Sequence, residues 1–151
     1  MKHLLYIPAA VLIFVLACGN PQNSEIEEAL NLREKALETN DLDLYMTLIS
    51  PDYKEERAGK MLGPGDIKKN FTDTYPIFHT LEISSTDRSI YLKGNQAEVF
   101  QINRAEATIN DEKSVFKVQE KIVLEKIGDK WLIVKESDAD YFTGYAFGNI
   151  E

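Results

Sequence analysis

Behind an apolar leader, the first half of the chain repeats its apolar residues every three or four positions, which is the spacing of one helix face. Ser24-Glu25-Ile26-Glu27 fits a capping box, with Ser24 as the N-cap, and predicts the start of a first helix. Asp41 is typical of a second N-cap, and Pro51 stops the apolar stripe that follows it. Gly63-Pro64-Gly65-Asp66 predicts the start of a third helix.

After His79 the apolar period changes from about 3.6 residues to 2. Four strands are predicted, over residues 80–92, 96–109, 114–127 and 130–138, because turn residues rich in Gly, Asn and Asp separate them. The third strand alternates most clearly, and the residues expected on its buried face are Phe116, Val118, Glu120, Ile122 and Leu124. Short turns indicate an antiparallel sheet with one covered face. The fold class is therefore α+β, with three N-terminal helices packed on a four-stranded antiparallel sheet.

The chain begins with a positive charge and an apolar run that ends at its only cysteine. Lys2 precedes the run from Leu4 to Ala17, which has about the length of a secretory h-region and is too short to span roughly 30 Å of hydrocarbon. Val15-Leu16-Ala17-Cys18 resembles the lipobox of bacterial lipoproteins, although Leu16 is bulkier than the Ala or Ser usual at its position. The resemblance implies that the leader is removed and that the thiol of Cys18 is acylated.

Lipidation of Cys18 would anchor the chain to a membrane of the bacterial cell envelope, because each buried CH₂ group of an acyl chain contributes about 0.8 kcal/mol. The residue after the cysteine is Gly19, which resembles that of lipoproteins sent to the outer membrane. If the host has two membranes, we therefore expect the chain on the periplasmic face of the outer one. The alternatives are an ordinary signal peptide with a free cysteine and an N-terminal anchor helix. The expected organisation is a signal peptide over 1–17, a lipidated cysteine and short linker over 18–23, a domain over 24–138 and an aromatic C-terminal tail over 139–151.

Composition and charge argue against several classes of partner. The chain has 25 acidic and 17 basic side chains, for a net charge of −8. A surface this acidic repels phosphates, so we expect no nucleic acid partner. Beyond the leader, His79 is the only histidine and Cys18 the only cysteine, so no cluster of these metal ligands can form. The common nucleotide-binding and nucleophile-elbow motifs are absent from the sequence, and we expect no metal and no cofactor.

Three segments resemble the NTF2-like superfamily (SnoaL-like, cystatin-like α+β). They are EIEEALNLREKALETNDLDLYMTLISPDY, GPGDIKKNF and KIVLEKIGDKWLIVKESD. The resemblance covers the whole predicted domain and implies a curved sheet that wraps around the helices like a cone, with a pocket between them. The superfamily includes isomerases, dehydratases, hydrolases, cyclases and members without known activity, so the fold leaves the function open. Another helix-on-sheet α+β domain is the alternative.

The implied pocket needs inward-facing polar and aromatic side chains. The candidates are Tyr45, Tyr53, Phe71, Tyr75, Gln101, Asn103, Glu120 and Trp131, with core packing as the alternative for Phe71, Tyr75 and Trp131. Glu120 is a candidate general base, because a carboxylate among aliphatic residues costs several kcal/mol unless it is paired or protonated. Its alternatives are a salt bridge with Arg104 on the neighbouring strand and a place beyond the buried face. His79 is the second catalytic candidate, and its alternative is a hydrogen-bonded surface histidine.

Three functions remain. We favour a membrane-tethered, non-enzymatic envelope domain that binds a small apolar ligand or a protein partner, because the sequence offers no recognisable catalytic set. A structural or assembly homodimer is the second, formed through the sheet and the aromatic residues of the tail, which are Tyr141, Phe142, Tyr145 and Phe147. The alternatives for these rings are packing on their own subunit and closure of the pocket mouth. An isomerase- or lyase-type enzyme that uses Glu120 or His79 is the third.

Overall fold

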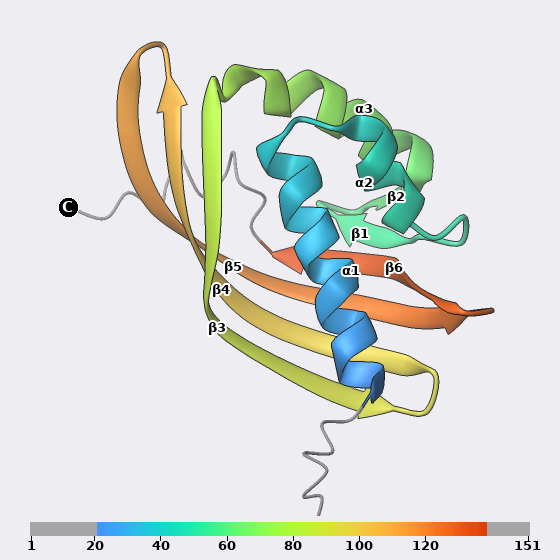
Figure 1. Cartoon of the computed structure of the whole chain (residues 1–151). Helices are drawn as coiled ribbons and strands as arrows, with labels where there is room; N and C mark the ends of the chain where they lie inside the picture. Colours follow the sequence, from blue (N-terminus) through green and yellow to red (C-terminus); the bar gives the residue numbers. More distant parts are fainter. Residues whose placement is uncertain (1–20, 139–151) are drawn as a thin grey trace, which may run out of the picture.

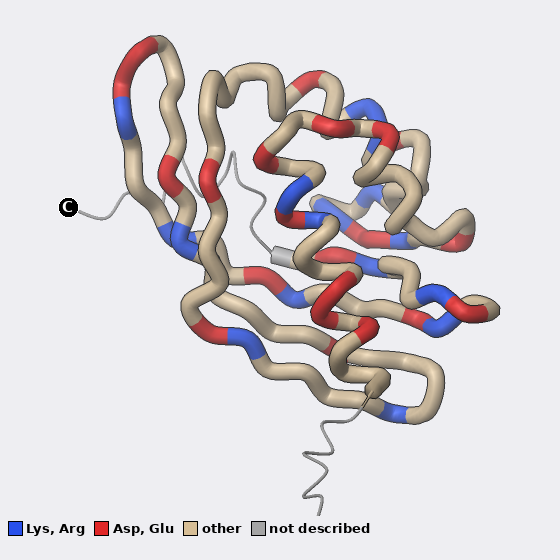
Figure 2. Tube along the Cα trace, viewed as in Figure 1, with Lys and Arg blue, Asp and Glu red and all other residues tan. Residues whose placement is uncertain are grey.

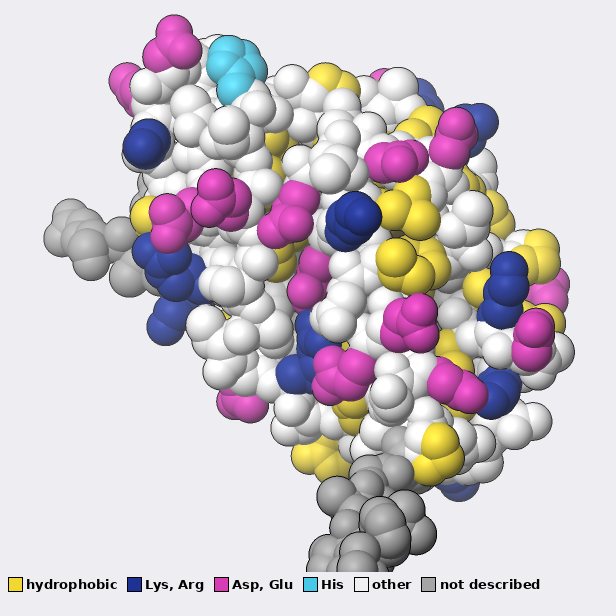
Figure 3. Space-filling view, in the orientation of Figure 1, with side chains coloured by type: hydrophobic (Ala, Val, Ile, Leu, Met, Phe, Trp, Pro, Cys, Tyr) yellow, Lys and Arg dark blue, Asp and Glu magenta, His cyan; other side chains and the backbone are white. Residues whose placement is uncertain are grey.

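The computed structural model describes residues 21–138 (Figure 1). The predicted signal peptide, the lipidated Cys18 and the aromatic tail lie outside these residues, so they stay predictions. Among the described helices, none is both long enough and apolar enough to cross a membrane. The charged positions are spread over the fold, and acidic ones recur along α1 (Figure 2). On the face seen in Figure 3, acidic and basic side chains alternate with apolar ones, and no large basic patch forms.

Three α-helices form one layer of the fold: α1 (Pro21–Glu38), α2 (Leu42–Leu48) and α3 (Pro64–Thr74), the last followed by the 3₁₀ turn η1 (Tyr75–Ile77). Asp41 caps α2 as predicted, because its Oδ1 accepts a hydrogen bond from the backbone N–H of Leu44 at 2.9 Å. The predicted capping box of α1 is wrong: Ser24 lies inside a helix that already includes Pro21.

The other layer is an antiparallel sheet in the order β3-β4-β5-β6. Its strands are β3 (Thr80–Lys93), β4 (Gln96–Ile109), β5 (Glu112–Ile127) and β6 (Lys130–Asp138), each within two residues of the predicted bounds. A small hairpin of β1 (Glu55–Arg57) and β2 (Lys60–Leu62) fills the connection between α2 and α3. Figure 1 shows the long strands curving around α1, so the sheet presents a concave face to the helices.

Two β-bulges change which side chains face the helix layer. In β3 the register shifts so that Thr86 has no partner on β4, and in β6 it shifts so that Val134 has none on β5. A bulge inserts one residue into a strand and so reverses the alternation of faces beyond it. As a result, the strand positions of Arg88 and Glu136 face inward, opposite the inward-facing Gln101 and Ile122.

The core lies between α1 and the concave face of the sheet. Residues with no exposed surface come from both layers, and they include Ile26, Leu30, Phe116, Val118, Ile122, Leu124 and Ile133. The predicted alternation of β5 is therefore confirmed, since its buried face holds the expected aliphatic and aromatic residues. Polar residues are buried in the same core, namely Arg33, Ser50, Glu55, Gln101, Asn103 and Glu120. Because buried polar groups need partners, this set leads to the candidate site.

Candidate binding cavity and its charge network

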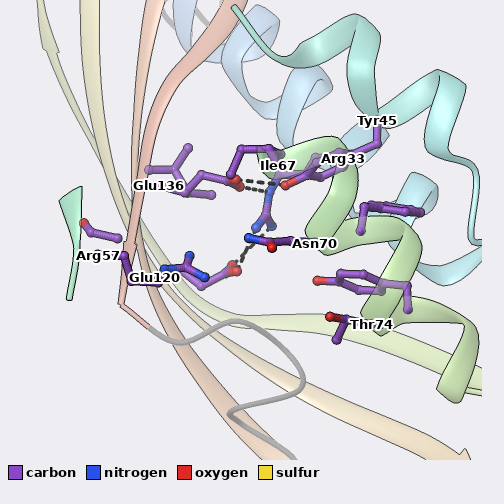
Figure 4. A pocket seen from close by; sticks show the side chains of 12 residues that line it. Arg33, Tyr45, Arg57, Ile67, Asn70, Thr74, Glu120 and Glu136 are labelled. Atoms are coloured by element: carbon purple, nitrogen blue, oxygen red, sulfur yellow. Dashed lines mark hydrogen bonds and ion pairs between the residues drawn. The ribbon is translucent and has the colours of Figure 1, made fainter. Parts of the chain in front are cut away.

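A buried arginine on helix α1 is the centre of the site. Arg33 lies on the apolar stripe of α1, between Leu30 and Leu37, so helical periodicity turns it toward the sheet. Its Nη2 donates to Oε1 of Glu120 at 2.9 Å and its Nη1 donates to Oε2 of the same carboxylate at 3.3 Å. Its Nε donates to Oε1 of Glu136 at 2.6 Å. One guanidinium thus joins α1 to carboxylates on β5 and β6 (Figure 4).

The carboxylate of Glu120 is held by four donor contacts. Besides the two from Arg33, the side-chain amides of Gln101 and Asn103 donate to its Oε2 at 2.8 and 3.1 Å. A carboxylate offers about four acceptor sites, so these donors fix its position. Glu120 is thus buried and ion-paired, but the alternative that named Arg104 as its partner is wrong. Arg104 pairs with Glu106 on the outer, exposed side of β4, and Arg33 takes its place inside.

Tyr45 of α2 and Tyr53 of the following loop surround Glu136. The Tyr45 hydroxyl donates to Oε2 of Glu136 at 2.8 Å. Burial, reinforced by the negative charge of Glu136, raises the pKa of Tyr45 well above its ordinary value, so the hydroxyl remains a donor at neutral pH. The Tyr53 hydroxyl accepts from the backbone N–H of Glu136 at 3.2 Å. Burial likewise raises the pKa of Tyr53.

Backbone pairing with β6 places Tyr53 beside Glu136. The segment after α2 covers the outer edge of β6, because the N–H of Ser50 donates to the carbonyl of Ile133 at 2.9 Å and the N–H of Lys54 donates to that of Val134 at 3.0 Å. Tyr53 lies between Ser50 and Lys54 in the sequence, and its hydroxyl donates to Oε2 of Glu55 at 2.8 Å. The network then continues outward to Arg57.

Glu55 is buried in β1 and links Tyr53 to Arg57. The Nε of Arg57 donates to its Oε1 at 3.0 Å, and Nη2 donates to its Oε2 at 3.2 Å. Arg57 is half-buried and lines the cavity described below.

Gln101 connects Glu120 to a second ion-pair cluster. While its Nε2 donates to Glu120, its Oε1 accepts from Nε of Arg88 at 2.8 Å. The Nη atoms of Arg88 bind Glu27 and Glu34 on α1. Burial raises the pKa of Glu34; the charge of Arg88 opposes this increase and that of Glu120 adds to it.

A small cavity opens beside Arg33, between α3 and the paired strands β5 and β6 (Figure 4). About 60 Å³ of it is open to the centres of water molecules, which is room for several waters. Its charged wall comprises Arg33, Arg57, Glu120 and Glu136, and its opposite wall comprises Tyr45, Ile67, Asn70, Phe71, Thr74 and Tyr75. Ile122 and Ser137 complete the lining. The cavity can hold a small molecule with a polar end and an apolar body.

Aromatic rings form the apolar part of the helix-side wall. The ring centroids of Tyr45 and Phe71 are 5.0 Å apart, and those of Phe71 and Tyr75 are 4.7 Å apart in a stacked arrangement. Pro76 ends α3, so η1 continues the row to Phe78, whose ring is 5.9 Å from that of Tyr75.

The predicted pocket residues divide into three groups. Tyr45, Phe71, Tyr75 and Glu120 line the cavity. Gln101 and Asn103 lie behind it and donate to the carboxylate of Glu120, and Tyr53 accepts from the backbone N–H of Glu136. Trp131 lies apart in the core, with its Nε1 donating to Glu25 at 3.0 Å. His79 is exposed at the start of β3, where its backbone N–H donates to the carbonyl of Thr108.

Sequence reasoning missed several residues of the cavity, chiefly Arg33, Arg57, Asn70 and Glu136. A signal existed for Arg33, since a charged residue on an apolar helix stripe calls for a buried partner. Strict alternation places Glu136 on the outer face, and only the bulge at Val134 turns it inward. Between residues 21 and 138, no group of three or more His, Cys, Asp or Glu side chains is arranged to hold a metal.

Comparison with known proteins identifies the fold. No family model and no curated protein matches the sequence. Solved structures match it, and one is an NTF2-like superfamily protein of Salmonella enterica serovar Typhimurium, with 23% identity and a TM-score of 0.66 over 78% of this chain and 90% of that one. A Streptomyces avermitilis protein of the NTF2-like family, with a proposed dehydratase activity, has 14% identity and a TM-score of 0.69 over 78% of this chain and 95% of that one.

A Nostoc punctiforme protein with a cystatin-like fold and unknown function is similar to the same extent. It has 16% identity and a TM-score of 0.64, over 78% of this chain and 90% of that one. At such identities the likeness concerns the fold and not the activity. The chain therefore has the NTF2-like α+β fold that its sequence predicts, with three helices packed on a four-stranded antiparallel sheet.

Proposed function

We propose that the domain is a non-enzymatic binding module that holds a small molecule in the cavity beside Arg33. The observation that carries this proposal is that protein side chains already donate hydrogen bonds to both cavity carboxylates. Glu120 receives four donor contacts, and Glu136 accepts from Arg33 and Tyr45. A general base needs a lone pair directed at the proton that it removes, whereas the lone pairs of Glu120, the predicted base, are directed at protein donors. The arrangement suits recognition by fixed groups better than proton transfer.

We further propose that the mature chain is anchored by lipid on Cys18 in the bacterial cell envelope, on the periplasmic face of the outer membrane where the host has one. The lipobox-like Val15–Cys18 at the end of the apolar run supports this. Only two residues separate Cys18 from the start of α1 at Pro21. Extended, they span no more than about 7 Å, so the N-terminal end of α1 would lie close to the lipid surface.

Lipidation is tested by the mass of the mature protein. Expressed in a bacterial host, the chain should begin at Cys18 and carry acyl chains, and it should fractionate with membranes. The Cys18→Ala variant should keep its leader and lack the added mass. A wild-type protein with a free Cys18 thiol or an uncleaved leader would contradict the proposal.

Ligand binding is tested by native mass spectrometry of the full-length protein purified from its own host in mild detergent. We expect a co-purifying small molecule that the Asn70→Trp variant loses, because Asn70 of α3 points into the cavity (Figure 4). Lys68→Trp is the matched control on the exposed side of the same helix. A spectrum without ligand, or equal ligand content in both variants, would count against a filled cavity. If the ligand is chemically converted on incubation, the domain is an isomerase- or lyase-type enzyme and not a binding module. The dehydratase activity proposed for the similar Streptomyces avermitilis protein is the reason to test for this.

Assembly through the outer face of the sheet is a second candidate function. Tyr91 and Phe100 are 62% and 43% exposed there, their rings meet edge to face at 5.8 Å, and Lys121 lies over the Phe100 ring. Contiguous exposed apolar patches mark protein interaction sites, and this pair is the candidate for one. Sedimentation of the full chain in detergent should show a dimer that Phe100→Lys dissociates. A monomeric wild type would exclude this function.

A further inference from the structure

The cavity has two chemically different walls. On the sheet side, Glu120 and Glu136 line it, both also bound to Arg33. On the helix side, the stacked rings of Phe71 and Tyr75 line it. Carboxylate oxygens accept N–H donors, and aromatic faces attract cations. A molecule that carries both N–H donors and a positive charge therefore matches both walls at once.

The cavity lining itself has two arginines and two glutamates, so the negative excess around it comes from the network behind it. Among the described side chains, the hydrogen-bonded network behind it contains the arginines Arg33, Arg57 and Arg88 and the glutamates Glu27, Glu34, Glu55, Glu120 and Glu136. Three positive charges against five negative ones leave an excess of two negative charges. The excess is the same when the two most exposed members, Arg57 and Glu27, are set aside.

This excess lies where water screens it poorly. The side chains of Glu34 and Glu136 are each only 13% exposed, and those of Glu55 and Glu120 are 3% and 4% exposed. The pKa of Glu34 is raised, first by its burial and further by the charge of Glu120. Unbalanced charge of one sign in a low-dielectric interior is costly, and a bound cation offsets that cost.

We infer that the ligand of this cavity is a small organic amine in its ammonium form. Its N–H groups would contact Glu136, whose carboxylate accepts from only two of the donors described above, and its carbon body would lie against Phe71 and Tyr75. The inference rests on the proposed binding function and narrows the class of ligand. The small free volume restricts the ligand to a short alkyl- or aryl-amine. A carboxylic acid of the same shape would add a third carboxylate to the lining and increase the negative excess of the network, so it should bind more weakly.

The test uses three probes of one shape: benzylamine, benzyl alcohol and benzoate. The full-length protein in non-ionic detergent micelles at pH 7 is titrated with each probe, and binding is followed by protein NMR. Benzylamine should bind at least about tenfold more tightly than benzyl alcohol, since a hydrogen bond to a charged group is worth about 1.5–3 kcal/mol and tenfold is about 1.4 kcal/mol. Benzoate should bind most weakly of the three.

Two variants locate the site. Glu136→Gln keeps the shape of the side chain but removes its charge, so it should lower the benzylamine affinity about tenfold and leave that of benzyl alcohol unchanged. Glu106→Gln is the matched control on the outer face and should change neither. Should Glu136→Gln fail to fold, Tyr75→Leu alters only a half-buried ring and should weaken benzylamine severalfold.

The outcomes separate this inference from the proposed function. Equal affinities for the three probes, or a preference for benzoate, overturn the amine and leave a binding cavity in place. A preference for benzylamine that neither Glu136→Gln nor Tyr75→Leu reduces also overturns it, because the amine then binds elsewhere on an acidic surface. If no probe binds and native spectra hold no ligand, both the inference and the proposed function fail.

Discussion

The inner and outer faces of the sheet each carry an arginine–glutamate pair, in opposite surroundings. On the inner face, Arg33 meets Glu120, and their side chains are 6% and 4% exposed. On the outer face, Arg104 meets Glu106, and theirs are 41% and 51% exposed. An exposed pair contributes about 0–1 kcal/mol, whereas a buried charge that loses its partner costs about 3–5 kcal/mol. The same two residue types are therefore nearly neutral on one face and structurally decisive on the other.

The largest difference should appear when each arginine is removed. We expect Arg33→Met to lower the free energy of unfolding by about 3–5 kcal/mol, because it leaves Glu120 and Glu136 buried without their common partner. Arg104→Met should cost less than about 1 kcal/mol. Urea titration of residues 19–151, followed by circular dichroism, measures both. Comparable losses for the two variants would show that burial does not separate the pairs.

A smaller contrast separates two glutamines of β4, each of which donates to a glutamate of β5. Inside the fold, Gln101 donates to Glu120. At the exposed start of β4, Gln96 donates to Glu125 at 3.0 Å. We expect Gln101→Leu to cost about 1–3 kcal/mol, because it strips one donor from Glu120 and one acceptor from Arg88.

Gln96→Leu is the matched control and should lie within about 0.5 kcal/mol of the wild type, as surface substitutions do. The same urea titration compares the two variants. A Gln101→Leu variant as stable as the control would mean that the amide is not needed between the two ion-pair clusters.

The sequence indicates the faces of the regular parts of the strands well. On β5, alternation alone predicts that Phe116, Val118 and Glu120 share the buried face, and the structure confirms it. On β4 it likewise puts Gln101 and Asn103 on the face opposite Arg104. Period-2 spacing is a property of the backbone, so it holds wherever the register is unbroken.

The residues missed by sequence reasoning lie beyond breaks in register or in different elements. Arg88 and Glu136 each follow a bulge, and nothing in the local sequence announces that Thr86 or Val134 would be left without a partner. The partner of Glu120 is 87 residues away on α1. Pairing across layers depends on how α1 crosses the sheet, which no single-strand pattern contains. Cavity residues are therefore the hardest part to predict.

The last and smallest contrast lies in the titration of two glutamates, Glu34 on α1 inside the curved sheet and Glu106 on the outer face of β4. Burial raises the pKa of Glu34, whereas the hydrogen bond from Arg104 and its charge lower the pKa of Glu106. The ionised form of Glu34 therefore destabilises the fold, and this cost is relieved as the pH falls through its raised pKa. The ionised form of Glu106 stabilises the fold, and this contribution is lost as the pH falls through its lowered pKa. Carboxyl ¹³C NMR titration should place the pKa of Glu34 above, and that of Glu106 below, the ordinary glutamate value. A Glu34 that titrates at or below that value would mean that Arg88 and Arg33 fully compensate its burial, and the negative excess around the cavity would then carry no measurable cost.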